Sequence, residues 1–269
     1  MKLNKHRIIK VLAAIVLVIV VFASLGKFHN TLCNSIDIKI LNSSDVNFVD
    51  KNEVLAAIHK AVPDIEGYKM DSVDIYLLET TLRANPYIRK VAIYKTISGS
   101  LKIDVQQRMP VLMVVNNTGQ SYYIDNDGYI FGTCNNSHPP TIVANGFIKD
   151  KFDFSNGKIY KVDFANKKGA VGTGNTSADL FKLTQLIQAD DFWRDQIEQI
   201  YVNEFGEYEL VPMLGELILA LGSIDDYDKK MFILKQFYFK GLPRTGWNVY
   251  KQISVKYKDQ IVCKRLHKK

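Results

Sequence analysis

The sequence predicts an α+β protein: an N-terminal transmembrane helix, a small β-α-α-β-β unit, and a β-rich unit of mostly antiparallel strands with flanking helices. Three observations predict this class. Residues 11–25 form an uncharged apolar run, residues 35–109 alternate between strand and helix periodicity, and residues 110–269 carry short alternating stretches divided by turn residues. We therefore expect a cytoplasmic tail over residues 1–7, a membrane helix over residues 8–26, and both folded units beyond it.

The apolar run reads VLAAIVLVIVVFASL. With its flanks it gives a helix of roughly 28 Å at ~1.5 Å per residue, close to the hydrocarbon thickness of a bilayer, about 30 Å. Four basic residues precede it, which places the N-terminus in the cytoplasm: Lys2, Lys5, Arg7 and Lys10. The alternative is a cleaved signal peptide that ends near Val21-Phe22-Ala23. Both interpretations place residues 30–269 outside the cytoplasm.

The positive charge is concentrated at the two ends of the chain. The formal net charge is +7, with +4 on residues 1–10 and +5 on residues 256–269, so the residues between them sum to −2. A nucleic-acid-binding protein needs a basic face on its folded body. The sequence therefore predicts no nucleic-acid partner.

Two helices are expected in the first unit. Asp50 is placed to cap the first, with Glu53 three residues on as its capping-box partner. The second is expected over residues 71–84, capped by Asp71 or Ser72. The expected strands cover residues 36–40, 88–95 and 101–108, the last two forming a hairpin around Ser98-Gly99.

The second unit is expected to begin at Pro110 and to contain short strands and two helices. Ser177 is expected to cap the first of these helices. The expected strands cover residues 111–115, 122–124, 129–131, 197–202, 208–211, 216–221, 252–257 and 260–265, and the expected helices cover residues 177–189 and 226–239. Residues 132–176 show no clear periodicity.

Candidate catalytic and metal-binding patterns are incomplete. Residues 125–128, Asp-Asn-Asp-Gly, begin like a calcium loop but lack its later ligands, so we expect a hairpin turn. Residues 172–177 could offer backbone N–H groups to a phosphate, but they lack the lysine of a phosphate-binding loop, so we expect a flexible loop and a helix cap. No two histidines lie at i, i+4. We therefore expect no catalytic residue, cofactor or metal.

The three cysteines, Cys33, Cys134 and Cys263, are far apart and form no C-x-x-C pair, so zinc and thioredoxin-like chemistry lack their minimal spacing. A Cys134–Cys263 disulfide remains an alternative.

The C-terminal segment carries a different signal. It combines β-prone apolar residues with lysines, at Ile253, Val255, Lys256, Tyr257, Lys258, Ile261 and Val262. Such a segment is either an edge strand that lysines protect from aggregation or an edge that accepts a partner strand. The residues alone do not favour one over the other.

The assembled features resemble the bacterial cell-division family FtsQ/DivIB. The basic tail, single anchor, β-α-α-β-β unit and β-rich unit follow that family's order, and the first unit is similar to a POTRA domain. The stretch LETTLRANPYIRKVAIYKTISGSLKIDVQQRMPV, residues 78–111, is similar to the end of that domain and the start of the next. YYIDNDGYIF at residues 122–131, GLPRTGW at 241–247 and ISVKYKDQIVCKR at 253–265 are similar to parts of the family's β domain.

The resemblance implies a non-enzymatic scaffold of the divisome in the inner membrane at the division septum. It implies binding to FtsB-like and FtsL-like bitopic proteins and regulation of septal peptidoglycan synthesis. It also favours the partner-strand interpretation of the C-terminal segment around Tyr257. Two other classes remain as alternatives: a POTRA-type assembly factor or chaperone for exported proteins, and an exported hydrolase.

Overall fold

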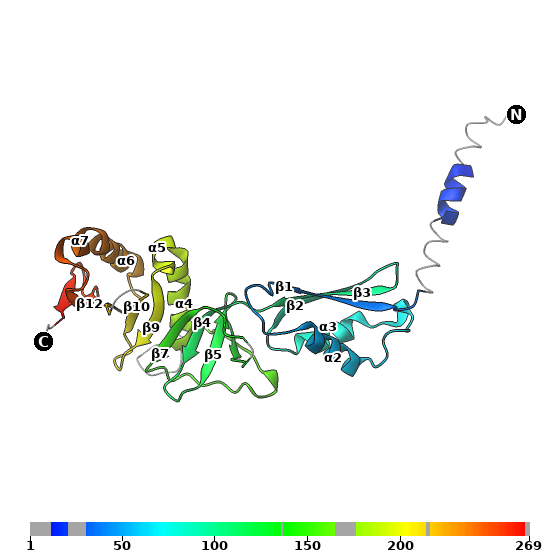
Figure 1. The fold of residues 1–269 in the computed structure, drawn as a ribbon, viewed down its shortest axis with the longest axis horizontal. Helices are drawn as coiled ribbons and strands as arrows, with labels where there is room; N and C mark the ends of the chain where they lie inside the picture. Colours follow the sequence, from blue (N-terminus) through cyan, green and yellow to red (C-terminus); the bar gives the residue numbers. More distant parts are fainter. Residues whose placement is uncertain (1–11, 21–30, 136, 165–175, 214–215, 267–269) are drawn as a thin grey trace, which may run out of the picture. The chain divides into compact units, whose positions relative to one another are not determined.

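The computed structural model describes residues 12–20, 31–135, 137–164, 176–213 and 216–266 (Figure 1). The chain divides into two compact units, Met1–Arg108 and Met109–Lys269. Residues 12–20 are helical, and their large apolar side chains are 50–67% exposed. Within the described ranges, no helix combines the length and apolar character needed to cross a bilayer. The membrane helix expected over residues 8–26 lies partly outside those ranges, because residues 8–11 and 21–26 are not described.

The first unit has the expected β-α-α-β-β order. Its elements are β1 (Ser35–Leu41), α2 (Lys51–Ala61), a 3₁₀ turn (Met70–Ser72), α3 (Ile75–Arg83), β2 (Ile88–Lys95) and β3 (Ser100–Gln107). The sheet order is β1-β3-β2, with β1 parallel and β2 antiparallel to β3. Alternation along β3 buries Leu101, Ile103 and Val105, which form the sheet side of the core.

Of the two helix caps predicted for this unit, one is confirmed and one is wrong. Asp50 caps α2 as predicted, since its Oδ1 accepts a hydrogen bond from the Glu53 N–H at 2.8 Å. The predicted cap of α3 at Asp71 or Ser72 is wrong, because both residues belong to the 3₁₀ turn. Val73 is buried in an extended conformation, so α3 begins only after it, and Asp74 is the cap.

The second unit is built on one ten-stranded mixed sheet. Its strand order is β13-β12-β11-β10-β9-β7-β4-β5-β6-β8. The strands are β4 (Pro110–Val115), β5 (Ser121–Asp125), β6 (Tyr129–Gly132), β7 (Ile142–Gly146), β8 (Tyr160–Lys161), β9 (Ile197–Val202), β10 (Tyr208–Pro212), β11 (Ile218–Gly222), β12 (Tyr250–Ser254) and β13 (Val262–Arg265). Most neighbouring pairs are antiparallel; the β4–β7, β7–β9 and β11–β12 pairs are parallel.

Helices and a sheet share one core in this unit. The helices are α4 (Thr176–Ala189), α5 (Asp191–Arg194), α6 (Tyr227–Gln236), a π-helical turn (Phe237–Gly241) and α7 (Leu242–Thr245). Buried side chains from α4, α5 and α6 join those of the strands in a single cluster, in which Trp193 is fully buried. The β5–β6 hairpin is confirmed, with Asp125 Oδ1 accepting from the Asp127 and Tyr129 N–H groups.

Two local expectations need correction, and one alternative is settled. Ser177 lies inside α4, and Asp150 takes the capping role by accepting from the N–H groups of Thr176 and Ser177. The helix expected over residues 226–239 begins at Tyr227, after Asp226 in a left-handed conformation, and continues through the π-helical turn. The cysteines are all free, so no disulfide joins Cys134 to Cys263. Residues 172–175 of the glycine-containing loop lie outside the described ranges.

Candidate functional site: the terminal sheet edge and its groove

Strand β13 forms one end of the ten-stranded sheet. It pairs antiparallel with β12, with Val262 opposite Ser254 and Lys264 opposite Gln252. Only one long side of β13 faces a neighbouring strand in this sheet order. The other side presents backbone donors and acceptors, which is the feature that a partner strand recognises.

The direction of these backbone groups follows from one hydrogen bond. The Leu266 N–H donates to the Val249 carbonyl at 2.9 Å, so it points toward β12. N–H groups alternate along an antiparallel strand, so those of Val262 and Lys264 point the same way. The N–H groups of Cys263 and Arg265 therefore point away from β12, toward the position that an added strand would occupy.

The structure separates the predicted site residues into two groups. Ile253 and Val255 are buried in the core, so their side chains are not available to a partner. The side chains of the remaining residues are exposed or half-buried: Lys256, Tyr257, Lys258, Ile261 and Val262. They lie in the loop between β12 and β13 and at the start of β13.

The strand expected over residues 252–257 is shorter than predicted. β12 ends at Ser254, and the chain then turns, with the Gln260 N–H donating to the Tyr257 carbonyl at 3.3 Å and Asp259 in a left-handed conformation. Tyr257 therefore lies in a turn, 53% exposed, and the edge strand is β13. The strand stops early because this segment contains lysines and an aspartate, whose charged side chains remain in solvent.

Two ion pairs fix the β12–β13 loop. Lys256 pairs with Glu207, which directly precedes β10, and Lys229 of α6 pairs with Asp259. The hydrogen bond from Lys256 is the main cause that holds the pKa of Glu207 below its usual range. The ammonium of Lys256 also lies 6.0 Å from the centre of the Tyr257 ring. These contacts hold the exposed Tyr257 next to the edge strand.

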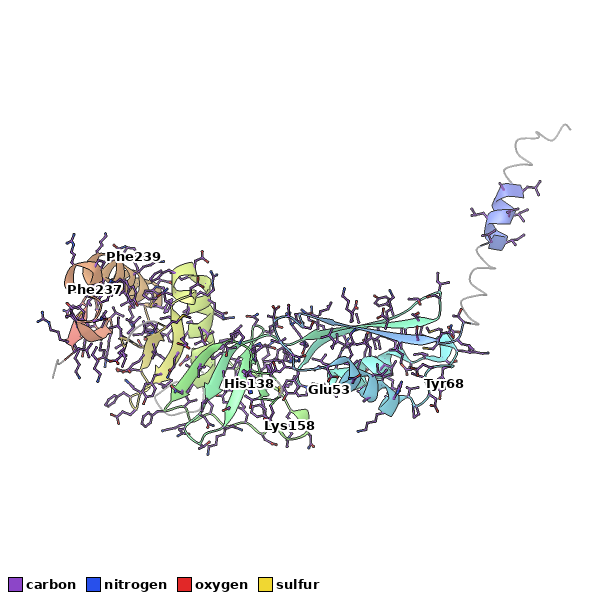
Figure 2. All side chains as sticks on the ribbon, viewed as in Figure 1. Glu53, Tyr68, His138, Lys158, Phe237 and Phe239 are labelled. Carbon is purple, nitrogen blue, oxygen red and sulfur yellow. The ribbon has the colours of Figure 1, made fainter. Side chains whose placement is uncertain are left out.

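An apolar groove of about 390 Å³ lies beside this edge. It is lined by residues of α6, of the π-helical turn and of the chain entering β13: Phe232, Ile233, Gln236, Phe237, Lys240, Gly241 and Ile261. Figure 2 labels Phe237 and Phe239 on the π-helical turn. Ile261 lines the groove and directly precedes β13, so the groove reaches the start of this strand. We call the groove and β13 together the edge-groove site.

Gly241 shapes the groove. A Cβ atom on this residue would lie 2.6 Å from the Phe237 ring, too close for any side chain without movement of the ring. The π-helical turn itself widens the backbone between α6 and α7, and such turns are frequent at functional sites. The groove was not predicted from the sequence. Its signal is the run FILKQFYFKG, which holds more aromatic residues than one buried helix face can cover.

A second, polar cleft lies on the same unit. Its walls carry carboxylates and lysines, among them Asp179, Lys182, Glu207, Asp225 and Lys256. The Tyr208 hydroxyl donates to Asp179 at 3.3 Å, and burial raises the pKa of this carboxyl. Among the described residues, no group of histidines, cysteines and carboxylates is arranged to hold a metal ion. The cleft offers charge pairing, and a second hydroxyl in its wall, that of Ser223, accepts from the Lys230 ammonium at 3.4 Å.

A small β-α-α-β-β unit followed by a unit built on one mixed sheet defines a two-unit α+β protein whose first unit is POTRA-like. Comparison with known families agrees: a POTRA-like domain matches residues 31–106, and the family described as FtsQ/DivIB, C-terminal related, matches residues 109–264. The chain belongs to the FtsQ/DivIB family. It is similar to the cell division protein FtsQ of Geotalea daltonii, with 24% identity over 207 residues, covering 75% of this chain and 67% of the relative.

Proposed function

We propose that this chain is a non-enzymatic scaffold of bacterial cell division that binds other division proteins outside the cytoplasm through its edge-groove site. Membership of the FtsQ/DivIB family supports a role in cell division. The outward backbone groups of β13 and the nearby apolar groove support the mode of binding. A partner would add a strand to β13 and place an apolar side chain or a helix face in the groove. The open edge of β13 is the observation that carries this proposal.

The proposed partners are FtsB-like and FtsL-like bitopic proteins, and the proposed outcome is regulation of septal peptidoglycan synthesis. Residues 35–109 would form the POTRA-like domain and residues 110–269 the partner-binding domain. The exposed and half-buried residues next to β13 are the proposed contacts, namely Lys256, Tyr257, Lys258, Ile261 and Val262. Ile253 and Val255 would support them from the core.

Residues 8–26 are the proposed single membrane anchor, with the N-terminus in the cytoplasm. The described part of this segment is a helix whose apolar side chains are largely exposed, as expected of a segment that contacts lipid. The anchor would lie in the inner membrane and hold both folded units outside the cytoplasm. The proposed location of the whole chain is the division septum.

Depletion of the protein in its host, combined with microscopy of a fluorescent fusion, tests this function. We expect filaments or chains of undivided cells and fluorescence at midcell. Normal division with fluorescence around the whole cell periphery would contradict the proposal. That outcome would favour a role of the POTRA-like unit in the assembly of exported proteins.

A further inference from the structure

Three segments of the first unit meet where the described chain enters it at Thr31. The Cys33 N–H donates to the Tyr68 carbonyl, the Met70 N–H to the Thr31 carbonyl, and the Asn34 N–H to the Gly99 carbonyl, each at 2.8 Å. The entering chain is therefore bound both to the loop before α3 and to the turn between β2 and β3. We call these three segments, residues 31–34, 66–69 and 96–99, the entry tip.

The entry tip exposes three large apolar side chains. Leu32 and Tyr68 are each 45% exposed, and Ile97 is 78% exposed. Their neighbours Cys33 and Met70 are buried, so the core of the unit does not depend on these three side chains. Figure 2 labels Tyr68 at the end of the unit that carries the β2–β3 turn.

Ile97 is an unusual residue for its position. The turn over residues 96–99 is closed by the Gly99 N–H, which donates to the Thr96 carbonyl at 3.2 Å, and Ile97 is its first central residue. Polar residues, proline and glycine are the usual choice in such turns, whereas β-branched residues favour strands. A large apolar side chain at this exposed place contributes little to folding, so a surface contact explains it better.

The length of the chain limits what this tip can meet. The inference rests on the proposed anchor, which ends at residue 26. Four residues lie between Gly26 and Thr31, which makes five Cα-to-Cα steps, and a fully extended chain spans at most about 3.6 Å per step, or roughly 18 Å. The headgroup layer is itself some 5–8 Å thick. The entry tip is thus held within about 10–13 Å of the headgroup layer even when the chain is fully stretched.

We propose that the entry tip inserts Leu32, Tyr68 and Ile97 into the interfacial layer of the bilayer in which the chain is anchored. Tyrosine prefers this layer because its ring is apolar and its hydroxyl polar. The exposed charges of the tip are one of each sign, Glu66 and Lys69, and the Glu66 carboxylate lies 3.3 Å from the His59 imidazole. Apolar insertion into lipid, rather than attraction to anionic headgroups, is the interaction that this composition fits. The contact would restrict how the first unit tilts on the membrane.

Photocrosslinking of the full chain in vesicles of phosphatidylcholine tests this proposal. A photoreactive aliphatic residue replaces Ile97 in one sample and Leu41 in the control. Leu41 is an exposed apolar residue of the same unit, six residues along β1 from Ser35, or about 20 Å toward the other end of the sheet. We expect at least about fivefold more lipid adducts from position 97 than from position 41, measured by mass spectrometry.

Equal adduct yields at the two positions would overturn the proposal, and so would adducts at position 97 that form only with a second copy of the chain. Ile97→Asp supplies a further check, because it should lower several-fold the lipid adducts of a photoreactive residue at position 32. The anchor is tested in the same samples. If alkaline carbonate removes the chain from the vesicles, the anchor itself fails; if the chain stays and position 97 yields no excess of adducts, only the entry tip fails.

Discussion

The ammonium of Lys256 pairs with the carboxylate of Glu207 and so connects the loop that carries Tyr257 to the turn before β10. Lys229 of α6 pairs with Asp259 on the same loop. The loop therefore has ion pairs on two sides, one with the turn before β10 and one with helix α6. The two ion pairs restrict the position of the exposed Tyr257, which lies outside any helix or strand.

The first prediction is a pH dependence of this loop. The pKa of Glu207 is lowered in the folded protein, so its pairing stabilises the fold above the ordinary carboxyl pKa, and the stabilisation is lost as pH falls through the lowered value. The pKa of Lys256 is raised, so at neutral pH both partners are charged. A double-mutant cycle with Glu207→Gln and Lys256→Met should show a stabilising coupling at pH 7 that is smaller at pH 3. Urea unfolding measures it; a coupling that is equal at both pH values would contradict the ion pair.

The second prediction concerns Tyr257. Tyr257→Asp should weaken binding of an FtsB-like partner at least about tenfold, because aromatic residues dominate interface energies and the change adds a charge. The free energy of unfolding should change by less than about 0.5 kcal/mol, since the side chain is exposed. Isothermal calorimetry measures the binding. Phe147→Asp is the matched control, 49% exposed on the same unit and outside the edge-groove site. Unchanged affinity of Tyr257→Asp would remove this residue from the interface.

The third prediction separates backbone from side chain at β13. Arg265→Pro removes an N–H that points away from β12, while Arg265→Ala removes only the side chain. Proline is tolerated at the outer side of an edge strand, so the fold should remain intact. If a partner strand pairs with β13, the proline variant should lose at least about tenfold in affinity and the alanine variant much less. Equal losses in both variants would show that the partner contacts the side chain and does not extend the sheet.

Local signals in the sequence predicted local structure well. The β2–β3 hairpin follows from the alternation of IRKVAIYK and LKIDVQQ around a glycine turn, and Asp50 caps α2 through a contact three residues away. The α3 cap was misplaced because Val73 is buried, and burial depends on the whole unit. β7 was not predicted, because its formation also depends on residues far away in the sequence. It lies between β4 and β9 in the sheet, and pairing with these two strands makes residues 142–146 a strand.

The hydrogen-bond partners of buried polar residues could not be predicted from the sequence pattern. Gln107 follows Leu101, Ile103 and Val105 on the buried face of β3. Its Oε1 accepts from the N–H groups of Phe48 and Val49 at 2.7 and 2.9 Å. Alternation places Gln107 inside, but its partners are some sixty residues away and no pattern identifies them. The edge-groove site is similar: the terminal segment indicated an edge, while the groove depends on α6 and the π-helical turn.

The last prediction tests the buried cap of α4. The Oδ2 atom of Asp150 accepts from the Ser177 N–H at 2.6 Å and from the Ser177 hydroxyl at 2.5 Å, and Asp150 is buried. Asp150→Ala would leave the buried Ser177 N–H without its acceptor, while the Ser177 hydroxyl keeps Tyr122 as a partner at 2.8 Å. The loss of the N–H acceptor costs about 1–3 kcal/mol of unfolding free energy. Urea unfolding of the full chain measures it. Asp153→Ala is the control, because Asp153 is exposed and its two side-chain contacts, the ion pair with Lys158 and the hydrogen bond from the Ser155 N–H, lie at the surface. Equal stability of the two variants would show that α4 does not depend on Asp150. A large loss in Asp150→Ala alone would identify this carboxylate as the contact that fixes the start of α4 on the sheet.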